Sequence, residues 1–351
     1  MKKKLLSVLM AAVMVAGVGG VGAAQVKADD EKILGAGIYS ASDNFNSYIG
    51  KAITNACDGI FKTNIEDGQN DQSTQNNQVD TMLAKGASAV AVSVCDVTAA
   101  PTLIQKCKDA GNVPIIFFNK EITDYDVINS YENAYQVTSR GGDYGASIQA
   151  QMVIDYWKEH PEMDKNGDGK LQLVYLMGDP GHTASQPRCD YLKSTIEDAG
   201  IEIDLLAEDT GMWVTATAKE KMDAWVSKYG DEIECCVAGN DAMALGALSA
   251  VEAAGFNTDG EESSKYIPIY GIDALPEILS KIESGEITGS VLQDAKTQGQ
   301  TIVKMAENLT SGKDAVDGIE GVETEEEAKA VRVPYQAITK DNLDLAKSTY
   351  E

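Results

Sequence analysis

Histidine is scarce in this sequence, since His160 and His182 are the only two in 351 residues. The sequence also has no GxSxG elbow, no Walker phosphate loop and no HExxH helix, the patterns typical of serine hydrolases, nucleotide hydrolases and zinc proteases. A glycosidase needs two facing carboxylates, which Asp43 and Asp273 could supply. The motifs therefore argue against most enzyme classes and leave a glycosidase as an alternative.

Basic residues are few. Lys and Arg total 29 against 55 Asp and Glu, which gives a formal net charge of −26. Proteins that bind nucleic acid or an anionic membrane surface rely on clustered Lys and Arg, and no basic patch appears. A sugar-responsive repressor would also need a helix-turn-helix, and this chain begins with an apolar segment instead.

Long apolar runs are missing except at the N-terminus. Lysines at positions 2–4 precede an apolar and small-residue run at 5–24, with cleavage points after Ala24 or Ala28. This pattern predicts a secretory signal peptide over residues 1–28 and an extracytoplasmic mature chain. The alternative is an uncleaved membrane anchor. A GVGGVG match to the dinucleotide fingerprint at 17–22 follows no strand and is discarded.

Paired CxxC cysteines are absent too. The six cysteines are Cys57, Cys95, Cys107, Cys189, Cys235 and Cys236. The first lies far beyond the apolar run, so no lipid anchor is expected. Three of the six lie in apolar runs of strand length, where thiols are usually buried. We therefore favour buried free thiols over disulfides, which remain the alternative.

The sequence does contain a regular alternation of apolar, strand-length runs and helical patterns. Predicted strands cover residues 33–39, 89–95, 113–118, 135–139, 171–177, 201–207, 234–238, 267–272, 287–292 and 331–338. Helical patterns separate most of them. Such alternation predicts an α/β fold with parallel sheets covered by helices on both faces, and the chain length predicts two doubly wound sheets.

Polar and aromatic residues follow these strands, where open α/β sheets bind ligands. The set comprises Asp43, Phe45, Asn119, His182, Arg188, Trp213, Asn240, Asp273 and Gln293. Carboxylates, amides and arginine bond to hydroxyl groups, and aromatic faces cover C–H patches, so the set suits a sugar. For a single Asn or Asp, the alternative is a helix cap.

The segment DKNGDGKLQ resembles the first nine positions of an EF-hand calcium loop. Asp164, Asn166 and Asp168 occupy positions one, three and five, and a glycine occupies position six. Lys170 offers a backbone carbonyl and Gln172 an amide oxygen. The Glu expected at position twelve is replaced by Tyr175, so another carboxylate must complete the site; an acidic surface turn is the alternative.

Several segments together resemble the periplasmic glucose/galactose-binding proteins, which are type I periplasmic binding proteins and sugar-binding components of ABC transporters. The segments are SDNF, GQNDQSTQNNQVDTMLAKG, FFNKE, DKNGDGKLQ, GDPGH, MWVTATAKEKMDAW, AGNDAMALGA, YGIDALPE and VRVPYQAITKDN. They span nearly the whole mature chain in order. The resemblance implies no enzyme but a monomeric periplasmic receptor with two hinged lobes, which presents a pyranose to a transporter and often to a chemoreceptor.

The resemblance also assigns roles to individual residues. Asp43, Asn119, His182, Arg188, Asn240 and Asp273 match hydrogen-bonding positions, and Phe45 and Trp213 match the aromatics that sandwich the sugar ring. Glu234 matches the distant carboxylate that completes a structural calcium site with Asp164, Asn166, Asp168, Lys170 and Gln172. The implied lobes are residues 32–137 plus 295–331 and residues 140–292 plus 335–351, joined by crossings near Thr138, Gln293 and Val333.

Two positions depart from the family pattern. Ala184 stands where the family has an Asp that holds the anomeric hydroxyl, and Gln293 replaces an Asn. A charge-assisted hydrogen bond worth about 1.5–3 kcal/mol is therefore missing unless Ser185 or a water replaces it. Our hypothesis is that the pocket is open at the anomeric end and accepts a glycoside or a different hexose.

Overall fold

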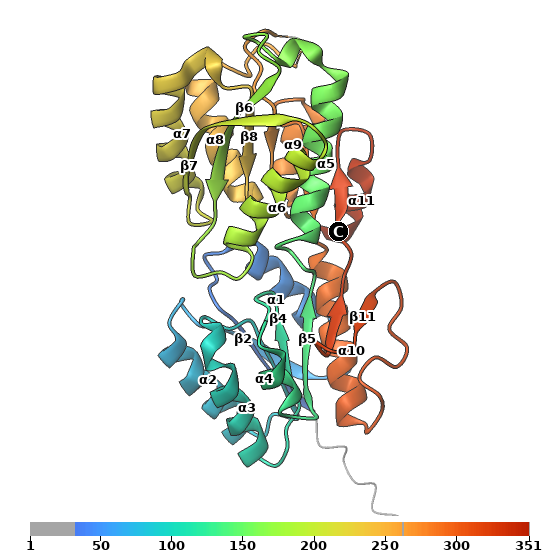
Figure 1. Ribbon diagram of the computed structural model, residues 1–351. Coiled ribbons are helices and arrows are strands. Elements are labelled where there is room, and N and C mark those ends of the chain that lie inside the picture. Colours follow the sequence, from blue (N-terminus) through green and yellow to red (C-terminus); the bar gives the residue numbers. More distant parts are fainter. Residues whose placement is uncertain (1–31, 262, 351) are drawn as a thin grey trace, which may run out of the picture. The chain divides into compact units, whose positions relative to one another are not determined.

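The structure is a computed structural model that describes residues 32–261 and 263–350, so the predicted signal peptide lies outside the described residues. Strands and helices alternate along the chain (Figure 1), which confirms the predicted α/β fold with parallel sheets. Within the described ranges, no helix is both long and apolar enough to cross a bilayer.

The first sheet has seven strands in the order β11-β12-β5-β4-β3-β1-β2, all parallel except β11. They are β1 (Ile33–Ile38), β2 (Lys62–Asp67), β3 (Ala89–Val92), β4 (Ile115–Phe118), β5 (Ala134–Thr138), β11 (Glu323–Glu325) and β12 (Ala330–Arg332). Strands β3 and β4 read AVAV and IIFF and are fully buried, as expected for central parallel strands. The polar edge strand β2, KTNIED, has no such apolar signal and was not predicted.

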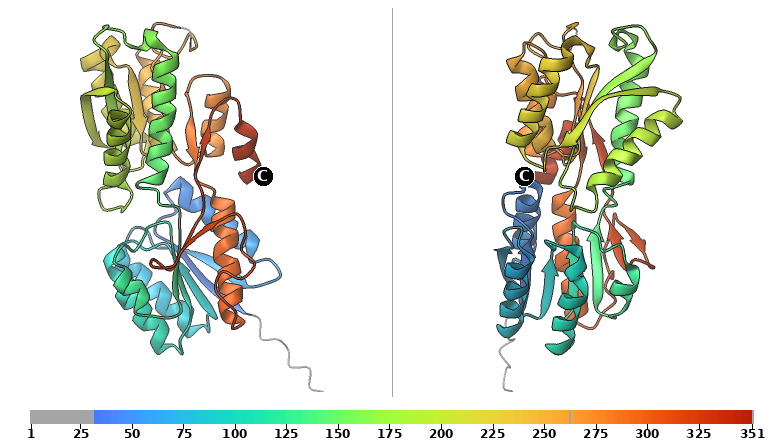
Figure 2. Two further views of the ribbon diagram at one scale, coloured as in Figure 1. Left: turned by 45° about the vertical axis from the view of Figure 1, so that its right-hand side comes forward. Right: turned by 60° about the vertical axis from the view of Figure 1, so that its left-hand side comes forward.

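Helices cover both faces of this sheet (Figure 2). One face packs against α1 (Asn44–Ala56) and α10 (Ala295–Thr310), and the other against α2 (Gln72–Ala84), α3 (Ala100–Asp109) and the short α4 (Tyr125–Asn129). Each face therefore has its own hydrophobic core.

The second sheet has four parallel strands in the order β7-β6-β8-β9. They are β6 (Lys170–Met177), β7 (Glu202–Thr210), β8 (Cys235–Ala238) and β9 (Ile269–Tyr270), and β10 (Ser290–Leu292) pairs with β13 (Gln336–Ile338) beside them. One face packs against α5 (Tyr144–Glu159) and α6 (Ser185–Asp198). The other packs against α7 (Thr215–Tyr229), α8 (Asp241–Ala253), α9 (Pro276–Glu283) and α11 (Leu343–Tyr350).

The chain passes between the two sheet systems after β5, after β10, and between β12 and β13. The prediction of one continuous strand at 331–338 is wrong, because β12 pairs in the first sheet and β13 pairs with β10. Pro334 lies between them, and proline has no N–H with which to continue a ladder.

All six cysteines are free thiols, and all but Cys95 are buried. Burial raises the pKa of Cys57 and Cys95 to about 11 and that of Cys107 and Cys189 to about 12. These thiols therefore stay protonated at neutral pH, in agreement with the favoured prediction.

Candidate functional site

The polar residues that follow the strands converge on one small cavity. It is lined by Tyr39, Asp43, Phe45, Asn119, His182, Arg188, Trp213, Asn240, Asp273 and Gln293. The nine side chains that the sequence singles out for ligand binding thus lie together, and Tyr39 joins them. They come from strand ends of both sheets, the usual location of ligand sites in open α/β folds. Their role in binding stays a prediction.

Asp43 lies at the start of α1 and serves two purposes. Its Oδ1 accepts a hydrogen bond from the backbone N–H of Asn46 at 2.7 Å, which caps the helix. Its Oδ2 accepts one from the Tyr39 hydroxyl at 2.6 Å. Burial, followed by the charge of Asp43, raises the pKa of Tyr39 well above its usual value, so this hydroxyl remains a donor. Helix capping and cavity lining are therefore compatible.

His182 and Asn119 face each other from the two sheet systems. His182 Nδ1 accepts a hydrogen bond from the N–H of Ala184 at 3.1 Å, so the proton of the neutral ring lies on Nε2. Nε2 lies 3.4 Å from Asn119 Oδ1. Burial, with smaller contributions from Lys120 and Arg188, lowers the pKa of His182 well below its usual value. The imidazole therefore offers a neutral donor.

The Trp213 ring packs closely against the backbone of Gly178. A Cβ added at Gly178 would lie 2.0 Å from the indole Cζ2, so only glycine fits there. The His182 ring meets the indole edge to face, with centroids 5.4 Å apart and planes at 75°. The Trp213 Nε1–H is buried and has no hydrogen-bond partner among the described residues. The ring is thus fixed in place with one donor unused.

Arg188 connects the three segments that pass between the sheets. Its Nε donates to the carbonyl of Gly141 at 2.8 Å, and its Nη2 lies 3.3 Å from both Gln293 Oε1 and the Tyr335 hydroxyl. The guanidinium also lies over the Trp213 ring, 5.5 Å from its centroid. This buried side chain therefore links the crossings to the cavity.

Part of the strained backbone lies at the cavity. Three of the nine predicted residues have positive φ angles: Asn119 at 65°, Trp213 at 62° and Asp273 at 124°. Such conformations cost about 1–3 kcal/mol each in a non-glycine residue and cluster at ligand sites, where surrounding structure enforces them. The strain supports a functional role for this cavity.

Asp241 lies behind the cavity as a second buried carboxyl. Its Oδ1 bonds to the Ser290 hydroxyl at 2.6 Å and its Oδ2 accepts from the N–H of Leu275 at 2.8 Å. Burial raises the pKa of Asp241 to about 8. Burial, and then the charge of Asp241, raises the pKa of Asp273 well above its usual value. The protonation states of the two carboxyls are therefore linked.

Asp241→Asn is expected to remove a pH dependence of stability. An unfolded Asp has a pKa of about 4, so the folded chain holds a proton that the unfolded chain releases, and stability falls by about 1.4 kcal/mol per pH unit between those pKa values. Asn mimics the protonated acid. Melting curves from pH 5 to pH 9 should show that the melting temperature of the variant increases relative to that of the parent as pH rises. A constant offset between variant and parent across this pH range would contradict the expectation.

The cavity itself measures about 30 Å³, and a second cavity of about 310 Å³ adjoins it. Pockets for small molecules typically measure about 300–1,000 Å³, so the first cavity admits a ligand only when the facing side chains move apart. Ala184 precedes α6 and lines the second cavity. Ser185, which could replace the missing carboxylate, is fully buried and lines neither cavity.

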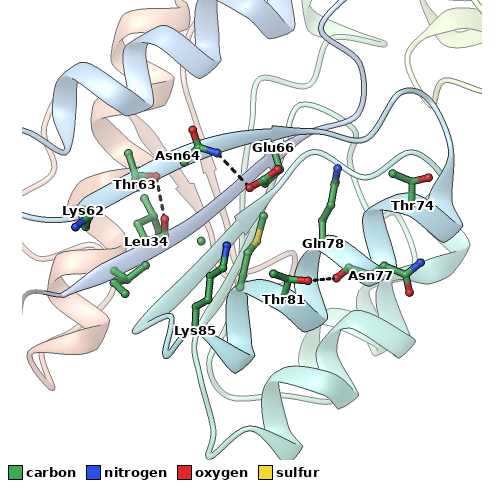
Figure 3. Close-up of a pocket in the computed structure, with 13 residues that line it drawn as sticks. Leu34, Lys62, Thr63, Asn64, Glu66, Thr74, Asn77, Gln78, Thr81 and Lys85 are labelled. Carbon is green, nitrogen blue, oxygen red and sulfur yellow. Dashed lines mark hydrogen bonds between the residues drawn. The ribbon is translucent and has the colours of Figure 1, made fainter.

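A larger groove of about 630 Å³ lies between α2 and strands β1 and β2 (Figure 3), and none of the predicted binding residues lines it. Several of its polar groups are already bonded locally: Thr63 donates to the Leu34 carbonyl, Thr81 to the Asn77 carbonyl, and Asn64 to Glu66. Because these groups bond locally and the strand-end residues converge elsewhere, the small cavity is the better candidate.

The predicted calcium loop precedes β6, and Glu234 lies beside it. The Glu234 carboxylate accepts from the N–H of Lys165 at 2.6 Å and of Gln172 at 3.0 Å. Gln172 Oε1 is buried and unbonded within the described ranges. Burial raises the pKa of Glu234, and the negative charge of Asp164 raises it further. This oxygen-rich set fits a hard cation. In the part of the chain that the structure describes, however, no three His, Cys, Asp or Glu side chains are placed to hold a metal.

Three residues near the cavity were not predicted. Tyr39 follows β1 and was assigned to the strand, Lys120 follows Asn119, and Tyr335 lies in the last crossing. The Lys120 ammonium lies 4.1 Å from the centroid of the Tyr39 ring and donates to the Cys95 carbonyl at 2.7 Å. Their positions in the sequence could have indicated a role at the cavity, because Tyr39 directly follows β1, Lys120 lies just beyond the end of β4 and Tyr335 follows Pro334.

Comparisons with known proteins confirm the predicted fold class. The family model described as a periplasmic binding protein domain matches residues 36–314. The chain is 42% identical over 313 residues to the D-galactose/methyl-galactoside binding periplasmic protein of Haemophilus influenzae, covering 88% of this chain and 90% of the relative. It is 28% identical to a xylitol-binding protein of Mycolicibacterium smegmatis, covering 90% and 80%. A solved ABC transporter solute binding protein from Bacillus halodurans with bound myo-inositol aligns with a TM-score of 0.72 at 27% identity, covering 91% and 98%.

Proposed function

Because the chain belongs to the periplasmic binding protein family, we propose that it is an extracytoplasmic receptor for a neutral hexose and delivers that sugar to an ABC transporter. The ligand class is galactose, glucose or a glycoside of either. The observation that carries the proposal is the convergence of nine predicted polar and aromatic residues on one cavity between strand ends of the two sheets. The similar protein named for D-galactose and methyl-galactoside supports the choice of sugar.

The chemistry of the cavity suits an uncharged polyol. Asp43 and Asp273 offer acceptors, Arg188 and the neutral His182 offer donors, and Trp213 offers an aromatic face. Sugar hydroxyls donate and accept, so they match this mixture. A ligand that contacts residues of both sheet systems favours the closed arrangement, which is the hinge closure described for periplasmic binding proteins.

Calorimetry with galactose, glucose and their methyl glycosides tests the proposal. We expect methyl galactoside to bind at least as tightly as galactose, because Ala184 offers no side-chain acceptor for a free anomeric hydroxyl. Tighter binding of both free sugars than of any glycoside would contradict the open anomeric end. No release of nitrophenol from a nitrophenyl galactoside is expected, since the proposed role is binding and not hydrolysis.

We also propose that calcium binds the loop before β6. Asp164, Asn166, Asp168, the carbonyl of Lys170, Gln172 and Glu234 would hold it. The support is the donor chemistry and the unbonded Gln172 Oε1. Bound calcium would offset the repulsion between the gathered carboxylates and tie the loop to β8.

Calcium removal is expected to lower the melting temperature and leave sugar affinity nearly unchanged. A cation at about 100 times its Kd stabilises the folded state by about 2.7 kcal/mol, or about 5–10 °C here. Melting with EGTA and after calcium is restored measures this. Glu234→Gln should abolish the calcium response, whereas the exposed control Glu232→Gln should retain it. Identical melting curves with and without EGTA would count against the site.

The remaining expectations belong to the same proposal. The N-terminal residues 1–28 would direct export, the mature protein would act as a monomer, and a chemoreceptor would be a second partner of the closed form. Size-exclusion chromatography of the mature chain tests the monomer directly.

A further inference from the structure

The second cavity adjoins the first. It measures about 310 Å³, and four residues line both cavities: Asn119, His182, Arg188 and Gln293. A ligand held in the first cavity therefore lies next to the second, separated from it only by side chains that line both spaces.

Small residues form part of its wall. Ala184 is 9% exposed and presents only a methyl group. On the neighbouring crossing segment, Gly141 and Gly142 also line the cavity, and a Cβ at Gly142 would lie 2.8 Å from Pro187 Cβ. Because side chains are minimal here, the space next to the shared residues stays open.

The charges around this cavity balance. Three arginines and three carboxylates line it: Arg140, Arg188, Arg332, Glu121, Asp143 and Glu325. Arg332 bonds to Glu121 at 2.8 Å and to Glu325 at 2.7 Å, and Arg140 pairs with Asp143. The carboxylates are thus already paired, and Arg188 donates to the carbonyls of Gly141 and Gly239. An ionic ligand therefore gains little from these charges, whereas an uncharged polar ligand meets many donors and acceptors.

Aromatic and hydroxyl side chains complete the lining. Tyr125 and Tyr191 contribute rings, and Tyr191 remains 47% exposed although it lines the cavity. Thr123, Thr138 and Thr183 contribute hydroxyls. This combination of rings and hydroxyls beside neutralised charges is suited to a sugar ring.

We propose that the second cavity is a subsite for a second, uncharged sugar unit, joined to the first hexose through its glycosidic oxygen. The protein would then bind disaccharides as well as monosaccharides. This inference rests on the proposed function, because it requires a hexose in the first cavity. At about 310 Å³, the space lies at the lower end of the usual range for small-molecule pockets, which is adequate for one ring.

Calorimetry of the full mature chain with galactose, lactose, melibiose and galactose 1-phosphate tests the subsite. The two disaccharides present galactose through a β and an α linkage. We expect at least one of them to bind as tightly as galactose, and galactose 1-phosphate to bind at least tenfold more weakly than that disaccharide. Tyr191→Ala and Thr123→Trp should each weaken the disaccharide about tenfold and change galactose affinity less than twofold. Tyr144→Ala is the matched control, because Tyr144 is 49% exposed and lines neither cavity.

The outcomes separate the subsite from the proposed function. If galactose binds and neither disaccharide does, the subsite is overturned and the receptor function stands. If galactose 1-phosphate binds tightest, the cavity is an anion site and the inference is wrong. If neither Tyr191→Ala nor Thr123→Trp changes disaccharide affinity, the placement of the second sugar in this cavity would also be overturned. If no neutral sugar binds, the proposed function itself fails.

Discussion

Trp213→Ala is expected to lower affinity for galactose about 100-fold, which corresponds to about 2.7 kcal/mol. The indole is held against Gly178 and beside His182, and it forms one wall of the cavity. Its loss removes the flat apolar surface on which the C–H face of a sugar packs, together with the unbonded Nε1–H. Isothermal titration with galactose measures the effect, and Trp213→Phe should recover most of it.

Trp225→Ala provides the control for this experiment. Trp225 lies in α7, packs against the core of the second sheet system and does not line the cavity. Its removal should lower stability and leave sugar affinity and the sugar-induced fluorescence change intact. Trp213→Ala should instead abolish the fluorescence change. Retention of parental affinity, within threefold, by a folded Trp213→Ala protein would refute the role of this ring.

Arg188→Met is expected to weaken galactose binding more than 100-fold and to lower the melting temperature by about 5–10 °C. Arg188 donates to the carbonyls of Gly141 and Gly239 and contacts Gln293. Methionine fills similar space but leaves these buried acceptors without a donor, at about 1–3 kcal/mol each. Titration and thermal melting should therefore change together.

Lys193→Met is the matched control for Arg188→Met, since it removes a cation from the same helix. Lys193 pairs with Glu208 at the surface at 2.9 Å, and such pairs contribute about 0–1 kcal/mol. Arg188→Lys tests whether the planar guanidinium is required, because lysine keeps the positive charge but lacks the parallel N–H donors. Full sugar affinity in Arg188→Met would show that the residue supports the fold alone.

Much of the fold follows from the sequence because buried parallel strands read as continuous apolar runs. β4 and β6 were identified this way, whereas the polar edge strand β2 carries no such pattern. The strand predicted at 331–338 is wrong as one continuous element because periodicity does not show which sheet a strand joins, although the resemblance implies a crossing near Val333. Pro334 was the only local signal of that break.

The residues of the candidate cavity were predictable because they follow the predicted strands. Carboxyl ends of parallel strands meet at one edge of a sheet, so Asp43 and Asn119 are expected to lie together on the first sheet. Only the family resemblance implies that Asp273, which follows a strand of the second sheet, faces them. The link from Arg188 to Tyr335 was not predictable, because it joins residues 147 positions apart across a crossing. The second cavity was equally hidden, since its lining depends on how the three crossings pack.

The proposed function depends on a hexose held between Phe45 and Trp213. A crystal structure of the mature protein with galactose tests this most directly. We predict the pyranose ring between these two aromatic side chains, with its hydroxyls bonded to Asp43, Arg188 and Asp273. Galactose bound in the groove beside α2, or a pyranose ring away from both aromatic side chains, would contradict the proposed function.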